Sequence, residues 1–189
     1  MAKQIEEIPT KEEIERLIEA VPSHTSIGLR NRACLRLLYG CGLRISEALN
    51  LRLKDYDREK RIVRILKSKR NKSRLVGVPK RTAAALDIWL ERRKTLELKT
   101  DLLIPSLQDK PLDASYMRKF LPRLAAEVGL TGRVHLHGLR HAFSVHLMED
   151  GFTVAEISKA LGHESIATTA VYLERINQNA LLDKLKERD

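Results

Sequence analysis

The sequence has 189 residues, 43% of them hydrophobic, and a formal net charge of +10 from 35 Lys and Arg against 25 Asp and Glu. This size suits one ordinary domain, and no apolar run approaches the roughly 18 residues of a membrane span. The basic excess favours nucleic acid as a partner, because each neutralised phosphate releases counterions. A membrane partner is not expected, because no segment combines a basic face with exposed bulky aromatics.

Two further features favour a cytoplasmic protein. Residues 1–7 carry charge and no apolar signal region, so a secretory leader is not expected. The two cysteines, Cys34 and Cys41, fall in one expected helix about two turns apart, which is too far for a disulfide. The sequence also contains no CxxC motif, so both cysteines are expected to stay reduced.

Helical periodicity dominates the first fifty residues. Residues 10–21 are expected to form a helix, because Thr10 and Glu13 have the spacing of a capping box ahead of regularly spaced apolar residues. A second helix is expected over residues 27–39, where it ends at a pair of glycines. A third, short helix begins near residue 45.

The pattern then changes to that of a small β-sheet. Residues 61–66 and 74–78 are short and β-branched, with a polar, basic stretch between them, which predicts a hairpin with a long basic tip. Residues 51–56 are expected as a first strand. The fold class is therefore a single domain, mostly α with a small antiparallel β-sheet (α+β). Further helices are expected over residues 81–98, 113–128, 137–150, 154–161, 165–173 and 176–186.

Two basic clusters could hold phosphate. Residues 40–47 place Arg44 just beyond a glycine turn at a helix start, where backbone N–H groups and a guanidinium together suit an anion. Residues 67–74 form the basic hairpin tip, which can reach into a groove and touch phosphates. Taken singly, each is more often an ordinary solvated surface.

A histidine-rich cluster adds a third candidate. His137 and Arg140 are three residues apart, so on a helix both face the same side and can converge on one phosphate. His137 and His141 are four apart, a spacing also used for zinc. The zincin motif needs a glutamate after the first histidine, and Gly138 stands there instead, so zinc is disfavoured.

The fourth cluster sets His163 nine residues before Tyr172, across a Ser/Thr-rich helix start. A single tyrosine in such a place is normally a packing residue. Together with the arginines and the lysine-rich loop, however, it completes a set of groups for phosphoryl transfer without metal. Guanidinium groups stabilise charge on the non-bridging oxygens, and nearby cations favour the phenolate form of a tyrosine.

In order and spacing, the four clusters resemble the tyrosine recombinase (phage integrase) family, particularly its Xer-like members. The matching stretches extend across nearly the whole chain, at residues 42–47, 71–74, 137–143 and 161–172. The resemblance implies a catalytic domain that cuts and rejoins double-stranded DNA by transesterification, with no cofactor and no metal. It also implies that four protomers assemble on two duplexes.

The resemblance assigns a role to each matching residue. Arg44 and Arg140 hold the scissile phosphate. His137 assists proton transfer and phosphate binding, and His163 donates a further hydrogen bond. Tyr172 attacks phosphorus, which leaves a 3′-phosphotyrosyl link and a free 5′-hydroxyl.

A hairpin lysine is implied as the general acid toward the 5′-oxygen. Counting back from residues 71–74 gives Lys69, whereas counting forward from the preceding strand gives Lys67. We prefer Lys69 because the downstream match is tighter, and Lys72 is the third candidate. Glu47 is expected to support the first arginine. The remaining basic residues expected to contact DNA are Lys67, Arg70, Lys72, Arg74 and His141.

Two other functions stay open, a type IB topoisomerase-like enzyme and a non-catalytic DNA-binding accessory factor. Most family members carry a separate N-terminal DNA-binding domain, and this sequence begins almost directly at the catalytic domain, as a truncation or a naturally short member would. We therefore expect weaker DNA affinity. Residues 174–189 have apolar residues at helical spacing, which pack on their own domain or, as the resemblance suggests, on a neighbouring subunit.

Overall fold

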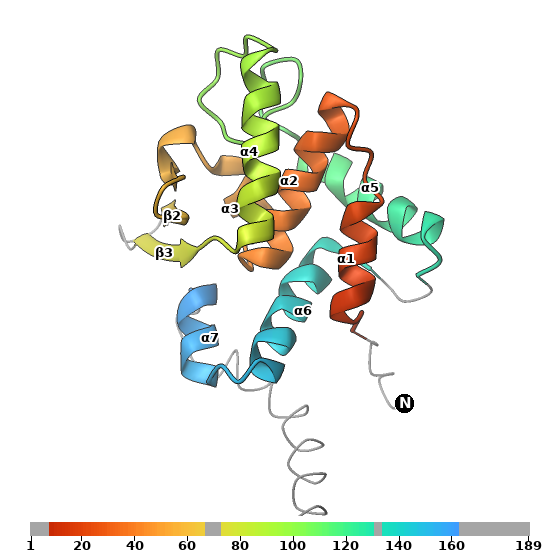
Figure 1. Cartoon of the computed structure of the whole chain (residues 1–189), viewed down its shortest axis with the longest axis vertical. Helices are drawn as coiled ribbons and strands as arrows, with labels where there is room; N and C mark the ends of the chain where they lie inside the picture. The colour runs from red at the N-terminus through yellow and green to blue at the C-terminus, as the bar shows by residue number, and fades with distance from the viewer. Residues whose placement is uncertain (1–7, 67–72, 131–133, 163–189) are drawn as a thin grey trace, which may run out of the picture. The chain divides into compact units, whose positions relative to one another are not determined.

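The computed structural model describes residues 8–66, 73–130 and 134–162, which divide between two compact units (Figure 1). The first unit extends to Phe143 and the second begins at Ser144, within one helix. Across the described ranges, no helix has both the length and the apolar character that a membrane crossing needs. The expectation of one domain over the whole chain stays a prediction.

Capping side chains set the start of the first two helices. α1 (Lys11–Glu19) begins at Thr10, whose hydroxyl accepts the Glu13 N–H at 3.2 Å, while the Glu13 carboxylate accepts the Thr10 N–H at 2.8 Å. This is the predicted capping box. α2 (Ser26–Gly40) begins at Thr25, whose hydroxyl accepts a backbone N–H of the first turn at 3.0 Å.

α2 and α4 (Lys80–Lys94) lie side by side at the centre of the first unit (Figure 1). Trp89 of α4 is fully buried and donates its indole N–H to the carbonyl of Leu103 at 2.8 Å. The largest core side chain therefore has its only polar atom satisfied. α4 ends four residues before the predicted end at residue 98, and Glu97 takes a left-handed φ of 51° just beyond it.

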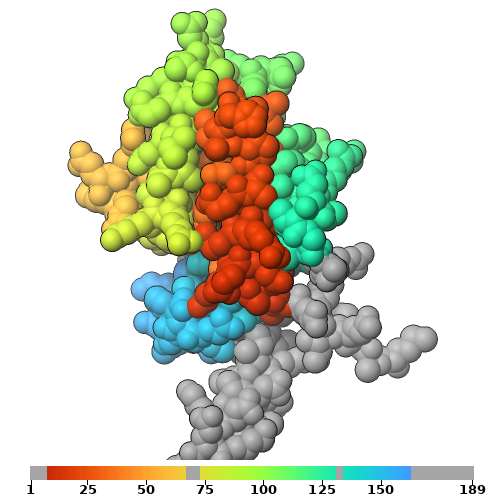
Figure 2. Space-filling model, turned by 45° about the vertical axis from the view of Figure 1, so that its right-hand side comes forward, coloured from red at the N-terminus to blue at the C-terminus, as the bar shows by residue number. Residues whose placement is uncertain are grey.

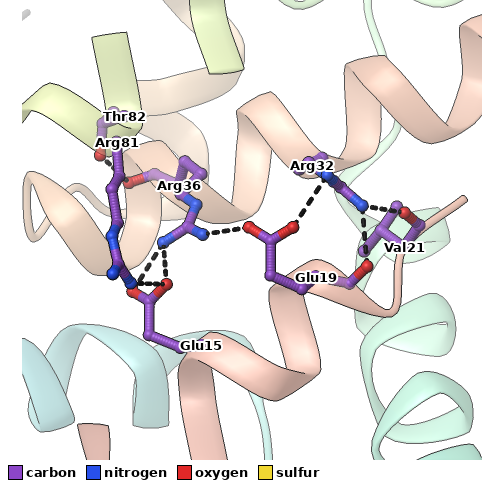
Figure 3. A network of polar contacts seen from close by, with 7 residues as sticks. All are labelled: Glu15, Glu19, Val21, Arg32, Arg36, Arg81 and Thr82. Carbon is purple, nitrogen blue, oxygen red and sulfur yellow. Dashed lines mark hydrogen bonds and ion pairs between the residues drawn. The ribbon is translucent and has the colours of Figure 1, made fainter. Parts of the chain in front are cut away.

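A polar network ties α1 to α2 and α4 (Figure 3). The buried guanidinium of Arg36 on α2 donates to Glu15 and Glu19 of α1, each at 2.7 Å. Glu15 also accepts from Arg81 of α4 at 2.7 Å, and Thr82 donates its hydroxyl to the carbonyl of Arg36. Charge-assisted hydrogen bonds centred on the buried Arg36 therefore link α1 to both α2 and α4.

The two cysteines are packing residues of the first unit. Cys34 lies within α2 and Cys41 directly follows it, and both are free and fully buried. Burial raises the pKa of each thiol to about 12, so both are protonated at neutral pH.

The predicted hairpin and small sheet are confirmed. The strands are β1 (Tyr56–Asp57), β2 (Ile62–Leu66) and β3 (Ser73–Gly77), antiparallel and in the order β1-β2-β3. β2 and β3 are in continuous register, from the pair of Ile62 with Gly77 to the pair of Leu66 with Ser73.

The first strand, predicted over residues 51–56, is largely wrong. Residues Leu53–Asp55 form a 3₁₀ turn instead, and a strand begins only after it. The Asp55 carboxylate accepts the N–H of Arg52 at 2.9 Å, which closes the turn locally. Arg52 also forms an isolated antiparallel bridge with Leu102, so this segment pairs with a distant loop instead of with the sheet.

Two more helices flank this core. α3 (Ile45–Asn50) is short and follows the glycine turn as predicted. α5 (Ala114–Glu127) begins at Asp113, whose carboxylate accepts the N–H of Ser115 at 2.8 Å. On the face shown in Figure 2, the segment that begins with α1 lies between α4 and α5.

α6 (Leu136–Glu149) crosses from the first unit into the second, which also holds α7 (Val154–Leu161). α7 begins with a second capping box, between Thr153 and Glu156, and ends at Gly162 with a φ of 65°. Both helices match the predicted ranges within one residue at each end, as far as they are described. Two predicted helices lie outside the described residues, over residues 165–173 and 176–186.

Candidate active site

One carboxylate, that of Glu47, is shared by three arginines from three separate elements. Its Oε2 accepts the backbone N–H of Arg44 at 2.8 Å, and its Oε1 accepts from the Arg44 guanidinium at 3.0 Å. Arg74 of β3 donates through both terminal nitrogens, each at 2.9 Å. The guanidinium of Arg140 on α6 lies 3.5 Å from the same carboxylate. The fold thus brings together both predicted phosphate ligands and their predicted support.

The electrostatics of this cluster favour an anion. Burial by itself raises the pKa of Glu47, but hydrogen bonds from Arg74 and from the Arg44 N–H outweigh it and lower the pKa to about 2. Glu47 is therefore ionised at any ordinary pH. One carboxylate against three guanidinium groups leaves an excess of positive charge, which suits a phosphodiester.

The turn before α3 depends on Gly42. Its φ is +61°, and a Cβ added there would lie 2.4 Å from the ring of Phe143. The Gly42 carbonyl also accepts a hydrogen bond from the Arg140 guanidinium. One glycine therefore both directs the chain into Arg44 and holds Arg140 in place.

The two phosphate-binding candidates differ in exposure. The Arg44 side chain is 43% exposed, whereas that of Arg140 is 4% exposed. Burial and the nearby charge of Arg44 lower the pKa of Arg140 to about 10, although Glu47 opposes the shift. Arg140 remains cationic at neutral pH and is preorganised beneath the surface, where Arg44 lies.

His137 lies in the first turn of α6, exposed at the surface. Burial of part of the ring, together with the charge of Arg140, lowers its pKa below the ordinary value. The imidazole is therefore neutral at pH 7, the form that can accept a proton.

The start of α6 is capped by a second histidine. The Nδ1 of His135 accepts the N–H of Gly138 at 2.9 Å, and the His135 carbonyl accepts the N–H of Leu139 at 3.2 Å. Its ring lies nearly parallel to that of His137, with centroids 6.5 Å apart. Because Nδ1 is the acceptor, the ring proton lies on Nε2 in the neutral form. His135 thus fixes the first turn of the helix that carries His137 and Arg140.

We predict that His135→Ala destabilises the protein by about 1 kcal/mol, the usual cost of a lost N-cap, and slows any reaction at this site. His135→Asn should restore both properties, because an Asn oxygen can accept the same N–H. Thermal melts and activity on one DNA substrate measure the two effects. Thr10→Ala is the matched control, because it removes a cap from α1 and should cost stability without loss of activity. Equal behaviour of the Ala and Asn variants at position 135 would contradict the capping role.

The remaining predicted residues differ in what the structure describes. Arg74 has a side chain that is 11% exposed and bound to Glu47, and His141 is half-buried on α6. Their predicted contacts with DNA stay predictions. The other predicted site residues lie outside the described ranges, namely Lys67, Lys69, Arg70, Lys72, His163 and Tyr172.

Sequence reasoning missed three features of this site. The partner of Arg74, the carbonyl ligand of Arg140 and the cap formed by His135 all depend on contacts that a motif does not display. The first two are between residues distant in the chain. The third is a local contact, but the helix was expected to begin at residue 137 and histidine is not among the usual N-cap residues, so no sequence signal indicated this cap.

Comparison with known proteins identifies the family of this fold. The model of the phage integrase family matches residues 8–179. Tyrosine recombinase XerC of Myxococcus xanthus is 35% identical over 186 residues, which cover 92% of this chain and 60% of the relative. XerC of Shewanella amazonensis is 34% identical over 152 residues, 80% of this chain and 51% of the relative.

Solved structures agree with these relatives. XerA recombinase superposes with a TM-score of 0.81 at 29% identity, over 90% of this chain and 61% of that one. XerH site-specific recombinase, bound to its palindromic difH substrate after cleavage, gives a TM-score of 0.76 at 28% identity. The match covers 92% of this chain and 53% of the XerH chain. The chain therefore spans between half and three-fifths of the length of these proteins, and the expected fold of a tyrosine recombinase catalytic domain is confirmed.

Proposed function

We propose that this chain, which belongs to the phage integrase family, is the catalytic part of a site-specific recombinase that cuts and rejoins DNA. The observation that carries the proposal is the cluster around Glu47, where Arg44 and Arg140 meet beside the helix start that bears His137. Paired guanidinium groups and a neutral imidazole match the needs of nucleophilic attack on a phosphodiester, in which charge must be stabilised on the non-bridging oxygens.

The proposed reaction is a transesterification. The phenolic oxygen of Tyr172 forms a bond to phosphorus and gives up its proton, and we propose that His137 assists this proton transfer. The bond from phosphorus to the 5′-oxygen breaks, and that oxygen leaves with the electron pair and takes a proton from Lys69. Arg44 and Arg140 hold the non-bridging oxygens throughout, and His163 donates a further hydrogen bond. Attack by the 5′-hydroxyl of a partner strand reverses these steps.

The proposed partner is double-stranded DNA, which the net charge of +10 favours. The XerH structure is of a recombinase bound to a DNA substrate, which supports the same partner here. Strand exchange between two duplexes needs four active sites, so we propose assembly of four protomers on DNA. A cytoplasmic location belongs to the same proposal, because the substrate is chromosomal or plasmid DNA.

Covalent capture tests the reaction on DNA of random sequence and needs no defined target site. A pool of duplexes with a randomised central segment, nicked so that the cleaved strand cannot be rejoined, is incubated with the protein in EDTA. We expect a covalent protein–DNA band on a denaturing gel for wild type and none for Tyr172→Phe. Sequencing of the captured DNA then gives the site and the position of cleavage. No band from wild type, on DNA that the protein binds, would refute the proposal and favour a non-catalytic DNA-binding protein.

A topoisomerase-like enzyme can be distinguished from a recombinase by which plasmids it relaxes. An enzyme that only relaxes supercoils would cleave with little sequence preference and would relax plasmid DNA that lacks the captured site. We expect relaxation to be confined to plasmids that carry the site. The family match and the XerA and XerH neighbours favour the recombinase.

A further inference from the structure

Arg74 lies on the inner face of the hairpin. Successive side chains of a strand point to opposite faces, and on β3 Leu75 is exposed, at 62%, whereas its neighbour Val76 is buried, at 6%. Arg74 shares the face of Val76, and its side chain is 11% exposed. Its guanidinium therefore points into the protein, although its charge and its place next to the basic tip predicted a contact with DNA.

The contact that Arg74 makes there is specific in geometry. Its two terminal nitrogens donate to the two oxygens of Glu47 in parallel, each at 2.9 Å, and the Glu47 side chain is 14% exposed. This bidentate pair fixes the orientation of the guanidinium relative to the carboxylate as well as their distance. A lysine ammonium cannot form such a pair. Arg74 is also paired across the sheet with Ile65, a buried residue of β2. The ion pair between Arg74 and Glu47 therefore holds β3 directly and β2 through the strand pairing.

Glu47 is already bound to the arginine that faces solvent. It accepts both the N–H and the guanidinium of Arg44, and it lies 3.5 Å from the guanidinium of Arg140. The anchor of the hairpin and the support of the phosphate ligands are therefore the same carboxylate. Arg74 donates to both oxygens of Glu47, and Arg44, whose side chain is 43% exposed, adds one side-chain hydrogen bond to the same carboxylate at 3.0 Å.

We propose that Arg74 is a positioning residue that fastens the base of the β2–β3 hairpin to the arginine cluster through Glu47. This inference rests on the proposed function, because its consequence concerns the lysine expected in that hairpin. Residue 74 follows Lys69 by five positions, so the pair fixes the strand end from which the lysine-bearing segment extends. Arg74 acts through Glu47 and does not contact DNA.

A substrate with sulfur in place of the 5′-bridging oxygen separates this role from its alternatives. Tyr172 again bonds to phosphorus, but the bond that breaks is phosphorus to sulfur, and the sulfur leaves with the electron pair as a thiolate. A thiolate is stable near neutral pH, whereas an alkoxide is not, so the sulfur substrate needs no proton from a general acid. A hairpin displaced from the phosphate therefore slows cleavage of the oxygen substrate only.

The variants are Arg74→Met and Arg74→Lys, with Arg64→Met as the matched control. Arg64 lies on β2, is exposed on the opposite face of the same hairpin and pairs with Leu75 in register. Each protein is assayed for the rate of adduct formation on both substrates at the cleavage site found by covalent capture. DNA affinity by gel shift and the melting temperature are measured on the same preparations.

We expect Arg74→Met to slow cleavage of the oxygen substrate by about 100-fold and of the sulfur substrate by less than about threefold, the signature of a misplaced general acid. DNA affinity should be unchanged, Arg74→Lys should fall between Met and wild type, and Arg64→Met should match wild type. Equal loss on both substrates, loss through weaker DNA binding, or no loss would each overturn the inference. If wild type forms no adduct with either substrate, the proposed function fails and this inference falls with it.

Discussion

Arg140→Met is expected to reduce the rate of covalent adduct formation by about 10³-fold, because it removes a preorganised donor to the developing charge on phosphate. Arg140 is 3% exposed and is held by the Gly42 carbonyl and the nearby Glu47 carboxylate, so it reaches the transition state without reorganisation. A lysine cannot reproduce the planar fork, and we expect Arg140→Lys to recover about tenfold at most. Single-turnover cleavage of the captured site measures both values.

The same substitution should leave the fold at least as stable. The pKa of Arg140 is lowered from 12.5 to about 10, mainly by burial, so its charge disfavours the folded state by about 3 kcal/mol at neutral pH. Methionine of similar length fills the space without that cost, and the loss of the donor to the Gly42 carbonyl, at about 1 to 3 kcal/mol, offsets part or all of the gain. We therefore expect an unchanged or higher melting temperature together with lost activity. A melting temperature several degrees below that of wild type would show that Arg140 stabilises the fold. Arg123→Met, on the exposed face of α5, is the control for replacing an arginine by methionine.

Local features of the fold were predictable from the sequence. The predicted capping box of Thr10 with Glu13 is confirmed, and the box of Thr153 with Glu156, which was not predicted, has the same spacing of three residues. The hairpin strands also followed from alternation and β-branching. Such signals are readable because the interaction that makes the element lies within one turn or one strand.

The errors arose where a side chain competed with the backbone pattern. Residues 51–56 alternate as a strand would, but the carboxylate of Asp55 turns back to the N–H of Arg52 and ends the strand pattern locally. The cap at His135 was missed because histidine is not among the residues that usually begin helices.

The candidate site was predictable in content but not in arrangement. The spacing of His137 and Arg140 gives their common helix face, and Arg44 was predicted from its place at a separate helix start. Nothing in the sequence pairs Arg74 with Glu47, because the two are 27 residues apart and only the packing of the hairpin against α3 brings them together. The basic tip predicted DNA contacts for Lys67, Arg70, Lys72 and Arg74, and these contacts stay predictions. Tertiary contacts of this kind decide which cations remain available for phosphate.

Glu47→Gln is expected to lower the free energy of unfolding by about 3 kcal/mol at pH 7, because it removes the negative charge that the guanidinium groups of three arginines share. The pKa of Glu47 is depressed from 4.5 to about 2. A group with a depressed folded pKa contributes stability above its unfolded pKa and loses it as pH falls toward the folded value. The difference in the free energy of unfolding between wild type and Glu47→Gln should therefore shrink below about pH 5 and reach about 1.4 kcal/mol by pH 3.

Urea unfolding of both proteins between pH 7 and pH 3 tests this dependence, and the difference between them cancels the acid sensitivity of all other groups. Glu127→Gln, at an exposed carboxylate of α5, should show no comparable trend. A difference that stays constant with pH would mean that Glu47 stabilises by packing and not by charge.

The catalytic consequence also follows from the geometry, because a neutral amide would leave Arg44 and Arg140 to repel one another. We therefore expect Glu47→Gln to slow cleavage of the oxygen and sulfur substrates alike, in contrast to Arg74→Met, which should spare the sulfur substrate.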